Sequence, residues 1–335
     1  MVIRALAIAA LLVGCGTFQD PNVVVDLRVL AVQASPPDQV IDIDITKPPS
    51  PADVLAQLVT TQVCALVADP GADRRLTWQM SICPFGANAT GERCADPAKT
   101  VVVAAGSIDD PDTTVPQPML CGAVPADASL LGVLLDALAD ADFGGLGGID
   151  YNLELRVSAE GAPIDDPDTT VFTSKTLRVV PRIPATITAN HNPTIDHVDM
   201  AIAGRAGATA LPLQRCVENP APPEVPPATK IRLTPAEPDG ARETYVAATI
   251  DGKGQTFTES LTYQWTASAG SFSKGKTGGP HQLSGQPAPL FTDFKTPAAG
   301  DLDGPTDLTI WIVQRDERLG VQWYEGCVRA MPAPP

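Results

Sequence analysis

The sequence has only three histidines and lacks the short motifs of the common hydrolases and nucleotide-binding enzymes. It contains no H-E-x-x-H motif for zinc, no G-x-S-x-G motif for a nucleophilic serine, and no glycine pattern for phosphates. We therefore expect no enzyme activity, no catalytic residue, no cofactor and no bound metal. A hydrolase that uses two carboxylates is an alternative, because 39 Asp and Glu residues offer many pairs whose separation is spatial.

Positive charge is also scarce. The chain has 23 Lys and Arg residues against 39 Asp and Glu residues, which gives a formal net charge of −16. Such a surface repels nucleic acid and anionic lipid headgroups, so we expect no nucleic-acid partner. The one prominent apolar run at the start, Ala5 to Val13, is shorter than the about 20 residues that a membrane-spanning helix needs.

The start of the chain instead has the pattern of a secreted lipoprotein. Arg4 supplies the positive charge of a signal peptide, and the letters L-V-G-C that end at Cys15 match the bacterial lipobox. We expect residues 1–14 to be a signal peptide, Cys15 to carry the lipid, and residues 15–22 to form a tether. Gly16 follows the cysteine, and the lack of aspartate there favours the outer membrane over the inner. A plain secretory signal with a chance cysteine is the alternative.

Six further cysteines remain, and an even number in an exported chain predicts disulfides, although six cysteines allow fifteen pairings. Two flank a short loop rich in Pro and Gly, two are the only ones in the second half, and two are left for each other. We therefore expect the pairs Cys64–Cys121, Cys83–Cys94 and Cys216–Cys327. Zinc binding is the rival interpretation, and the absence of C-x-x-C argues against it.

The 34 prolines and 27 glycines favour short strands separated by turns. Apolar and polar residues alternate, for example from Leu76 to Ile82 and from Tyr151 to Val157, which is the pattern of half-buried strands. Prolines near residue 182 mark a boundary. We expect an all-β protein with two β-sandwich domains in series, residues 23–182 and 183–335.

One segment has helical spacing instead. Asp127 is a suitable N-cap, Gly144 is a stop, and four leucines lie between them at helical intervals. These are Leu131, Leu134, Leu135 and Leu138. We expect an amphipathic helix near residues 127–143, inserted in the first domain and packed over its sheet; a partner-binding helix is the alternative.

Three groups of acidic residues raise the question of metal sites. The sequence I-D-D-P-D-T-T-V at 108–115 recurs at 164–171. Both copies could be turns that lead into strands, or their aspartates could bind calcium. The aspartates of 301–307 resemble the start of a calcium loop, but Ile312 stands where an EF-hand has its glutamate. His197 and Asp199 share a strand face, which favours an exposed edge over a metal cluster.

Aromatic residues make up only 5% of the chain. Trp311, Trp323 and Tyr324 fall on the last two expected strands. They form a weak candidate for a glycan-binding platform, and inter-sheet packing is the alternative. The platform requires the three rings to be exposed on one face.

Several segments resemble a known group. They are D-L-R-V-L-A-V-Q-A-S-P-P from Asp26, K-T-L-R-V-V-P-R from Lys175, N-H-N-P from Asn190, Y-Q-W-T-A-S-A-G-S-F from Tyr263 and W-I-V-Q-R-D-E-R-L-G-V-Q-W from Trp311. Together they resemble lipoproteins of myxobacterial type with immunoglobulin-like (PKD-like) β-sandwich domains. The resemblance implies two Ig-like sandwiches on the cell envelope, and it implies no catalytic residue and no ligand.

These observations favour a membrane-anchored envelope lipoprotein that acts as a structural, adhesion or protein-interaction module. The expected partners are the membrane, through the lipid, and a protein or glycan of the envelope. A carbohydrate-binding envelope protein and an envelope hydrolase are the alternatives. At the corner between the last two strands we also expect an ion pair between Arg315 and Asp316.

Overall fold

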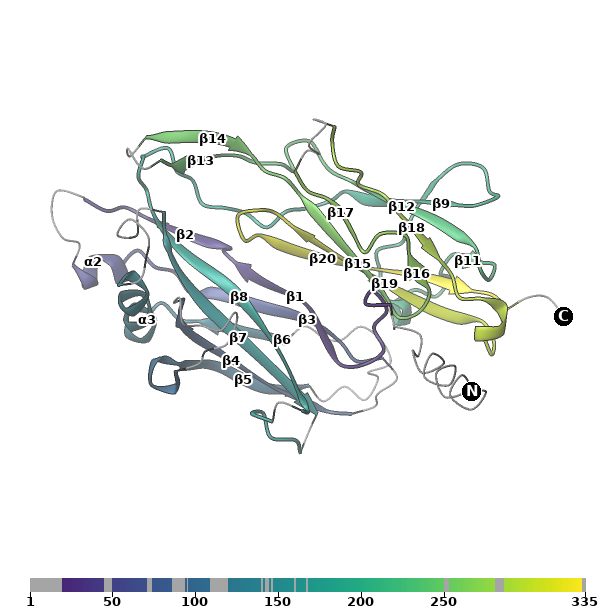
Figure 1. Ribbon diagram of the computed structural model, residues 1–335, viewed down its shortest axis with the longest axis horizontal. Coiled ribbons are helices and arrows are strands. Elements are labelled where there is room, and N and C mark those ends of the chain that lie inside the picture. Colours follow the sequence, from purple (N-terminus) through teal and green to yellow (C-terminus); the bar gives the residue numbers. More distant parts are fainter. Residues whose placement is uncertain are drawn as a thin grey trace, which may run out of the picture.

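The computed structural model describes residues 20–332, except 45–49, 71–73, 86–93, 95, 109–119, 140, 142–144, 146, 160, 167, 250–252 and 281–285. The described chain is nearly all β, with several sheets and two α-helices, so the expected all-β, sandwich-like class is confirmed. Figure 1 shows two groups of sheets, which we call the first lobe (β1–β8) and the second lobe (β9–β20). None of the helices described is both long and apolar enough to cross a bilayer.

The first lobe has two sheets. One has the order β1-β3-β6, and the other has the order β2-β8-β7-β4-β5, in which β2 runs parallel to β8. Their bounds are β1 (Arg28–Ser35), β2 (Asp38–Ile41), β3 (Thr61–Ala68), β4 (Leu76–Pro84), β5 (Val101–Ile108), β6 (Leu120–Val124), β7 (Ile149–Ala159) and β8 (Thr170–Pro181). A core that includes Val63, Met80 and Leu155 fills the space between the sheets.

Two helices accompany this lobe. The helix α3 (Ala128–Leu138) begins where expected, because the Asp127 side chain accepts hydrogen bonds from the first backbone amides. It packs against β4 and β7 of the sheet, as expected, but only one of the four leucines at helical spacing, Leu134, is buried. The other buried residues are Leu130, Val133 and Ala137, whereas Leu135 is 51% exposed. Apolar residues occur on several faces of this helix, so their spacing alone does not decide which face is buried.

Between β1 and β3 the chain forms β2 and then a short helix, α2 (Pro51–Leu55), which Ser50 caps. A short turn at Pro97–Lys99 (η1) precedes β5.

The second lobe has two five-stranded sheets and a separate hairpin. The sheets have the orders β10-β9-β12-β18-β16 and β11-β20-β19-β15-β17. Their bounds are β9 (His197–Ile202), β10 (Thr209–Ala210), β11 (Glu224–Val225), β12 (Lys230–Ala236), β15 (Thr262–Ala267), β16 (Ser271–Phe272), β17 (Lys276–Gly278), β18 (Thr292–Lys295), β19 (Thr306–Arg315) and β20 (Val321–Ala330). Between them lies a core that includes Tyr263, Trp265 and Phe294.

The hairpin β13 (Thr244–Ala248) and β14 (Gly254–Thr258) pairs only with itself among the described strands. Figure 1 shows it at the upper left, beyond the sheets of its own lobe. Its Tyr245 ring stacks on Phe257, with 5.6 Å between ring centroids. Short 3-10 turns at Cys216–Glu218 (η3) and Ala299–Asp301 (η4) complete the lobe.

Three disulfides join the cysteines, and they are the pairs inferred from position along the chain. Cys64–Cys121 links the paired strands β3 and β6, and Cys83–Cys94 closes the loop after β4. Cys216–Cys327 ties η3 to β20 across 111 residues of sequence. Each bond lies within one lobe, so the lobes are held together by non-covalent contacts.

A third apolar cluster lies between the two lobes, and we call it the seam. Its buried members come from the N-terminal segment, β1 and β3 on one side and from β19 and β20 on the other. They are Val24, Leu30, Ala31, Leu66, Ala68, Trp311, Val313 and Val321. The outer face of the β19–β20 pair is therefore covered by the first lobe, and this contact fixes how the lobes sit against each other.

Candidate functional site

The segment that follows the expected lipid attachment docks on the second lobe. The amide of Val24 donates to the carbonyl of Ala267 at 2.9 Å, and the amide of Ala267 donates to the carbonyl of Asn22 at 2.9 Å. Val23 thereby pairs with the end of β15 as a short parallel bridge. Asp20 closes a turn before it by accepting from the backbone and side-chain nitrogens of Asn22. Residues 20–22 of the expected tether are therefore bound to the protein body.

A glycine makes this docking sterically feasible. A Cβ atom on Gly275 would lie 1.9 Å from the side-chain oxygen of Asn22, so a larger residue there would force the Asn22 side chain to move. The carbonyl of Gly275 also accepts from the amide of Trp265 in β15. Cys15 and the expected signal peptide lie outside the described residues.

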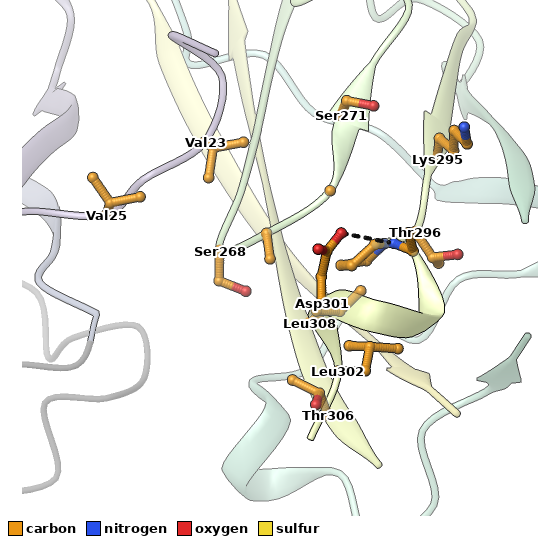
Figure 2. Close-up of a pocket in the computed structure, with 14 residues that line it drawn as sticks. Val23, Val25, Ser268, Ser271, Lys295, Thr296, Asp301, Leu302, Thr306 and Leu308 are labelled. Atoms are coloured by element: carbon orange, nitrogen blue, oxygen red, sulfur yellow. Dashed lines mark hydrogen bonds between the residues drawn. The ribbon is translucent and has the colours of Figure 1, made fainter. Parts of the chain in front are cut away.

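A pocket of about 510 Å³ lies beside the docked segment. In Figure 2, Val23 and Val25 form one side, and the short turn with Asp301 and Leu302 forms the other. The Asp301 carboxylate accepts from the amide of Ala298 at 3.2 Å, so it caps its own turn. Small and apolar side chains dominate the lining, and its described ionisable residues are Lys295 and Asp301.

The aromatic platform is wrong as an expectation, because the three rings do not share an exposed face. Trp311 is 2% exposed in the seam, and Trp323 packs partly buried against the same cluster. Tyr324 lies on the other face of β20 with the second-lobe core, where its hydroxyl accepts from the amide of Ile195. A neighbour in β20 necessarily points to the opposite side, since strand side chains alternate.

A buried ionic cluster also lies between the two lobes. It is centred on Arg318, in the loop between β19 and β20. Its guanidinium donates to the carbonyl of Thr188 at 2.8 Å and lies 3.7 Å from the carboxylate of Asp38 in the first lobe. It also lies 3.4 Å from Glu243 and 3.5 Å from Glu259 in the second lobe. Arg318 therefore joins the two lobes and the connection between them.

Burial destabilises the ionised form of two carboxyl groups in this cluster. Burial raises the pKa of Glu259 to about 7, with a further increase from Asp316 that Arg318 opposes. Burial also raises the pKa of Asp38, against the lowering effects of the Asn190 amide and of Arg318. The positive charge of Arg318 therefore lowers the free-energy cost of ionising these two buried carboxyl groups.

The expected ion pair between Arg315 and Asp316 was wrong. Asp316 accepts from the amides of Arg318 and Gly320, each at 2.7 Å, and from the side chain of Asn190 at 3.1 Å. Arg315 donates instead to the side chain of Gln264. The corner is thus fixed by backbone amides on a carboxylate, a common turn chemistry for aspartate.

The acidic groups considered as metal sites have other partners. Among the described residues, no three His, Cys, Asp or Glu side chains are placed to hold a metal ion. His197 lies 3.4 Å from Asp199 on the same strand face, as alternation predicted, whereas His191 contacts Glu243. Asp307 pairs with Arg329 on the neighbouring strand.

Only one copy of the repeated Asp-Pro sequence can be placed. Residues 109–115 of the first copy lie outside the described residues. In the second copy, Asp166 accepts from the amide of Asp168, and Asp165 pairs with Arg156. This copy forms a turn that leads into β8, as the simpler interpretation expected.

The residues that sequence reasoning missed are those that hold the lobes together. Asn190 donates to the carbonyl of Arg318, and Asn192 donates to the carbonyl of Ala34 while accepting from the amide of Val321. One signal was present: residues 310–313 are continuously apolar, which is typical of a strand covered on both faces.

Comparisons with known proteins do not assign the chain to a family. No protein-family model matches the sequence, and no curated protein matches it significantly. Function must therefore be argued from the residues and their geometry.

Proposed function

We propose that the chain is a lipid-anchored envelope protein, of the myxobacterial lipoprotein type, that serves as a structural, adhesion or protein-interaction module. In this proposal each lobe is an immunoglobulin-like sandwich and Cys15 carries the lipid. The three disulfides support an oxidising compartment outside the cytoplasm. The net charge of −16 supports attachment through a lipid and not through a basic surface.

The observation that carries the proposal furthest is that residues 22–24 dock on the end of β15. Four residues lie between Cys15 and Asp20, so a fully extended chain between these two residues spans at most about 18 Å. A lipid on Cys15 would therefore hold the β15 end of the second lobe close to the bilayer. The apolar seam and the Arg318 cluster would extend this fixed orientation to the first lobe, which suits a module that presents a surface.

The anchor is tested by expressing the full chain and its Cys15→Ala variant in a bacterium that processes lipoproteins. Fatty-acid labelling and fractionation should find the parent chain acylated in the membrane and the variant unlabelled. Thr17→Ala, two residues away, is the matched control and should behave as the parent. Membrane retention of the Cys15→Ala variant with unchanged label would refute the anchor.

The module role is tested separately, with the Cys15→Ala chain as bait in extracts of the source envelope. We expect saturable capture of one defined protein or glycan that a denatured bait does not retain. Capture of nothing under varied salt and pH would count against an adhesion or interaction role while leaving the anchor intact.

A further inference from the structure

A second pocket, of about 390 Å³, opens at the edge of the seam. β1 and β8 of the first lobe line one side, and β15 with the loop between β19 and β20 lines the other. Polar groups contribute more of this lining than in the pocket beside the N-terminal segment. Two of them, Lys175 and Arg315, are cations from different lobes.

Lys175 is buried without a counter-ion. Its side chain is on a residue only 8% exposed, and its ammonium donates to the carbonyl of Leu319, which is a neutral acceptor. No carboxylate lies within ion-pair distance of it among the described residues. Burial lowers its pKa to about 8; Asp316 opposes this decrease and Arg315 adds to it.

Arg315 is in the same situation. Its guanidinium donates to the side-chain oxygen of Gln264 at 2.9 Å and to the carbonyl of Leu30 at 3.4 Å, and both acceptors are neutral. Burial lowers its pKa, and no carboxylate lies within ion-pair distance of it among the described residues. Both side chains line the same pocket, and Arg315 adds to the lowering of the pKa of Lys175.

The acidic residues of the lining are committed to other donors. Asp316 accepts from two backbone amides and from Asn190. The two oxygens of Glu317 accept from the hydroxyls of Tyr245 and Ser260, at 2.9 and 2.6 Å. The lining segments of β1, β8 and β15 bring no other ionisable side chain.

A strained backbone residue beside the pocket supplies the hydrogen-bond acceptor of Lys175. Leu319 has a φ of 80°, a conformation that a leucine rarely adopts, and its carbonyl is the acceptor for Lys175. Strained residues of this kind concentrate at binding sites, where the surrounding structure holds them in place.

We propose that this pocket binds one small oxyanion between the ammonium of Lys175 and the guanidinium of Arg315. Two buried cations that line one polar cavity, neither with an ion-pair partner among the described residues, are costly unless an anion completes the site. Lys175 keeps two N–H donors that bond to no described residue, and the Nε–H of Arg315 bonds to none either, so a carboxylate, sulfate or phosphate group could be held from both sides. The ligand chemistry is that of an oxyanion small enough for this cavity.

The test is isothermal titration of the purified full chain in a neutral detergent and chloride buffer at pH 7, with sulfate, phosphate and acetate as probes. We expect saturable binding at one site per chain. Lys175→Met and Arg315→Gln should each weaken it by at least about tenfold, because each removes a charge-assisted contact. Lys276→Met, which removes an exposed lysine of the second lobe that does not line the pocket, is the control and should leave the affinity unchanged. A preference for acetate would assign a carboxylate ligand, and a preference for sulfate or phosphate a tetrahedral one.

The pH dependence gives an independent readout. Sulfate keeps its charge between pH 7 and 9.5, whereas Lys175, with a pKa of about 8, loses its proton in that range. Sulfate affinity should therefore fall as the pH rises, and Lys175→Met should abolish that dependence. Melting of each variant without anion checks its fold, and Arg315→Gln carries the test if Lys175→Met fails to fold. The proposal is overturned if no probe binds saturably, or if both folded variants bind as tightly as the parent.

Discussion

Replacing Arg318 by methionine should destabilise the protein by about 3–5 kcal/mol at pH 8, the usual cost of removing one partner from a buried ionic group. The arginine lies within 3.7 Å of Asp38, 3.4 Å of Glu243 and 3.5 Å of Glu259. Glu259 is only 3% exposed and Asp38 only 7%, so water cannot replace the lost partner. Methionine keeps the volume of the side-chain stem, which limits any contribution from a cavity.

The sign of the pH dependence follows from the same residues. A carboxyl group whose pKa is higher in the folded state binds its proton there more readily than in the unfolded chain. Stability therefore falls as the pH rises from the unfolded pKa toward the folded one. Glu259 already has a folded pKa of about 7, and the loss of Arg318 raises it further. The cost of Arg318→Met should thus be smaller at pH 5 than at pH 8.

Urea unfolding at both pH values, followed by tryptophan fluorescence with the disulfides intact, measures this difference. Arg205→Met is the matched control, because Arg205 is exposed and donates only to the carbonyl of Glu224. Its cost should be within about 0.5 kcal/mol. A loss below about 1 kcal/mol for Arg318→Met at pH 8, or an equal loss at pH 5, would contradict the role assigned to the cluster.

Three further predictions concern the seam, the disulfides and a single carboxylate. Trp311→Ala should cost about 3–5 kcal/mol in urea unfolding, whereas Leu135→Ala on the exposed face of α3 should cost about 0.5 kcal/mol or less; equal costs would show that the seam is not packed. Loss of the Cys216–Cys327 disulfide, which closes a loop of 111 residues, should destabilise the protein by about 4–5 kcal/mol. Loss of the Cys83–Cys94 disulfide, which closes a loop of 11 residues, should cost about 3 kcal/mol, and the reverse order would contradict the loop-closure argument. Glu259→Gln should reduce the loss of stability between pH 4.5 and 7, with its largest gain above pH 7, and an unchanged pH profile would show that this carboxyl does not titrate there.

The features of this fold that are local in the chain could be predicted from sequence. Period-2 alternation located β4 and β7, and the aspartate before α3 located the start of that helix. Segments with weaker patterns, such as β2 and β6, were missed because four or five residues carry too little periodicity. The buried stripe of α3 was misplaced because leucines occupy several of its faces.

The candidate site could be predicted only in part, since its residues come from segments far apart. Residues of β1, β8, β19 and the connection near Asn190 lie far apart in the chain, yet they meet between the two lobes. Nothing in any one of them indicates that Lys175 reaches the loop after β19. Such a contact depends on how two lobes dock, which no local pattern encodes.

The sequence by itself determined the number of cysteines available for pairing, the acidic net charge and the alternation that makes the chain all-β, and it contains the L-V-G-C pattern on which the proposed anchor rests. These properties depend on residue chemistry and on neighbours within a few positions. Only the tertiary structure decided what covers each strand face. Alternation assigns Trp311 and Val313 to one side of β19 and Ile310 and Ile312 to the other, but both sides are apolar. The docking of the first lobe makes the Trp311 side a buried interface in place of a glycan-binding surface, because apolar area is stabilised wherever a complementary surface removes it from water.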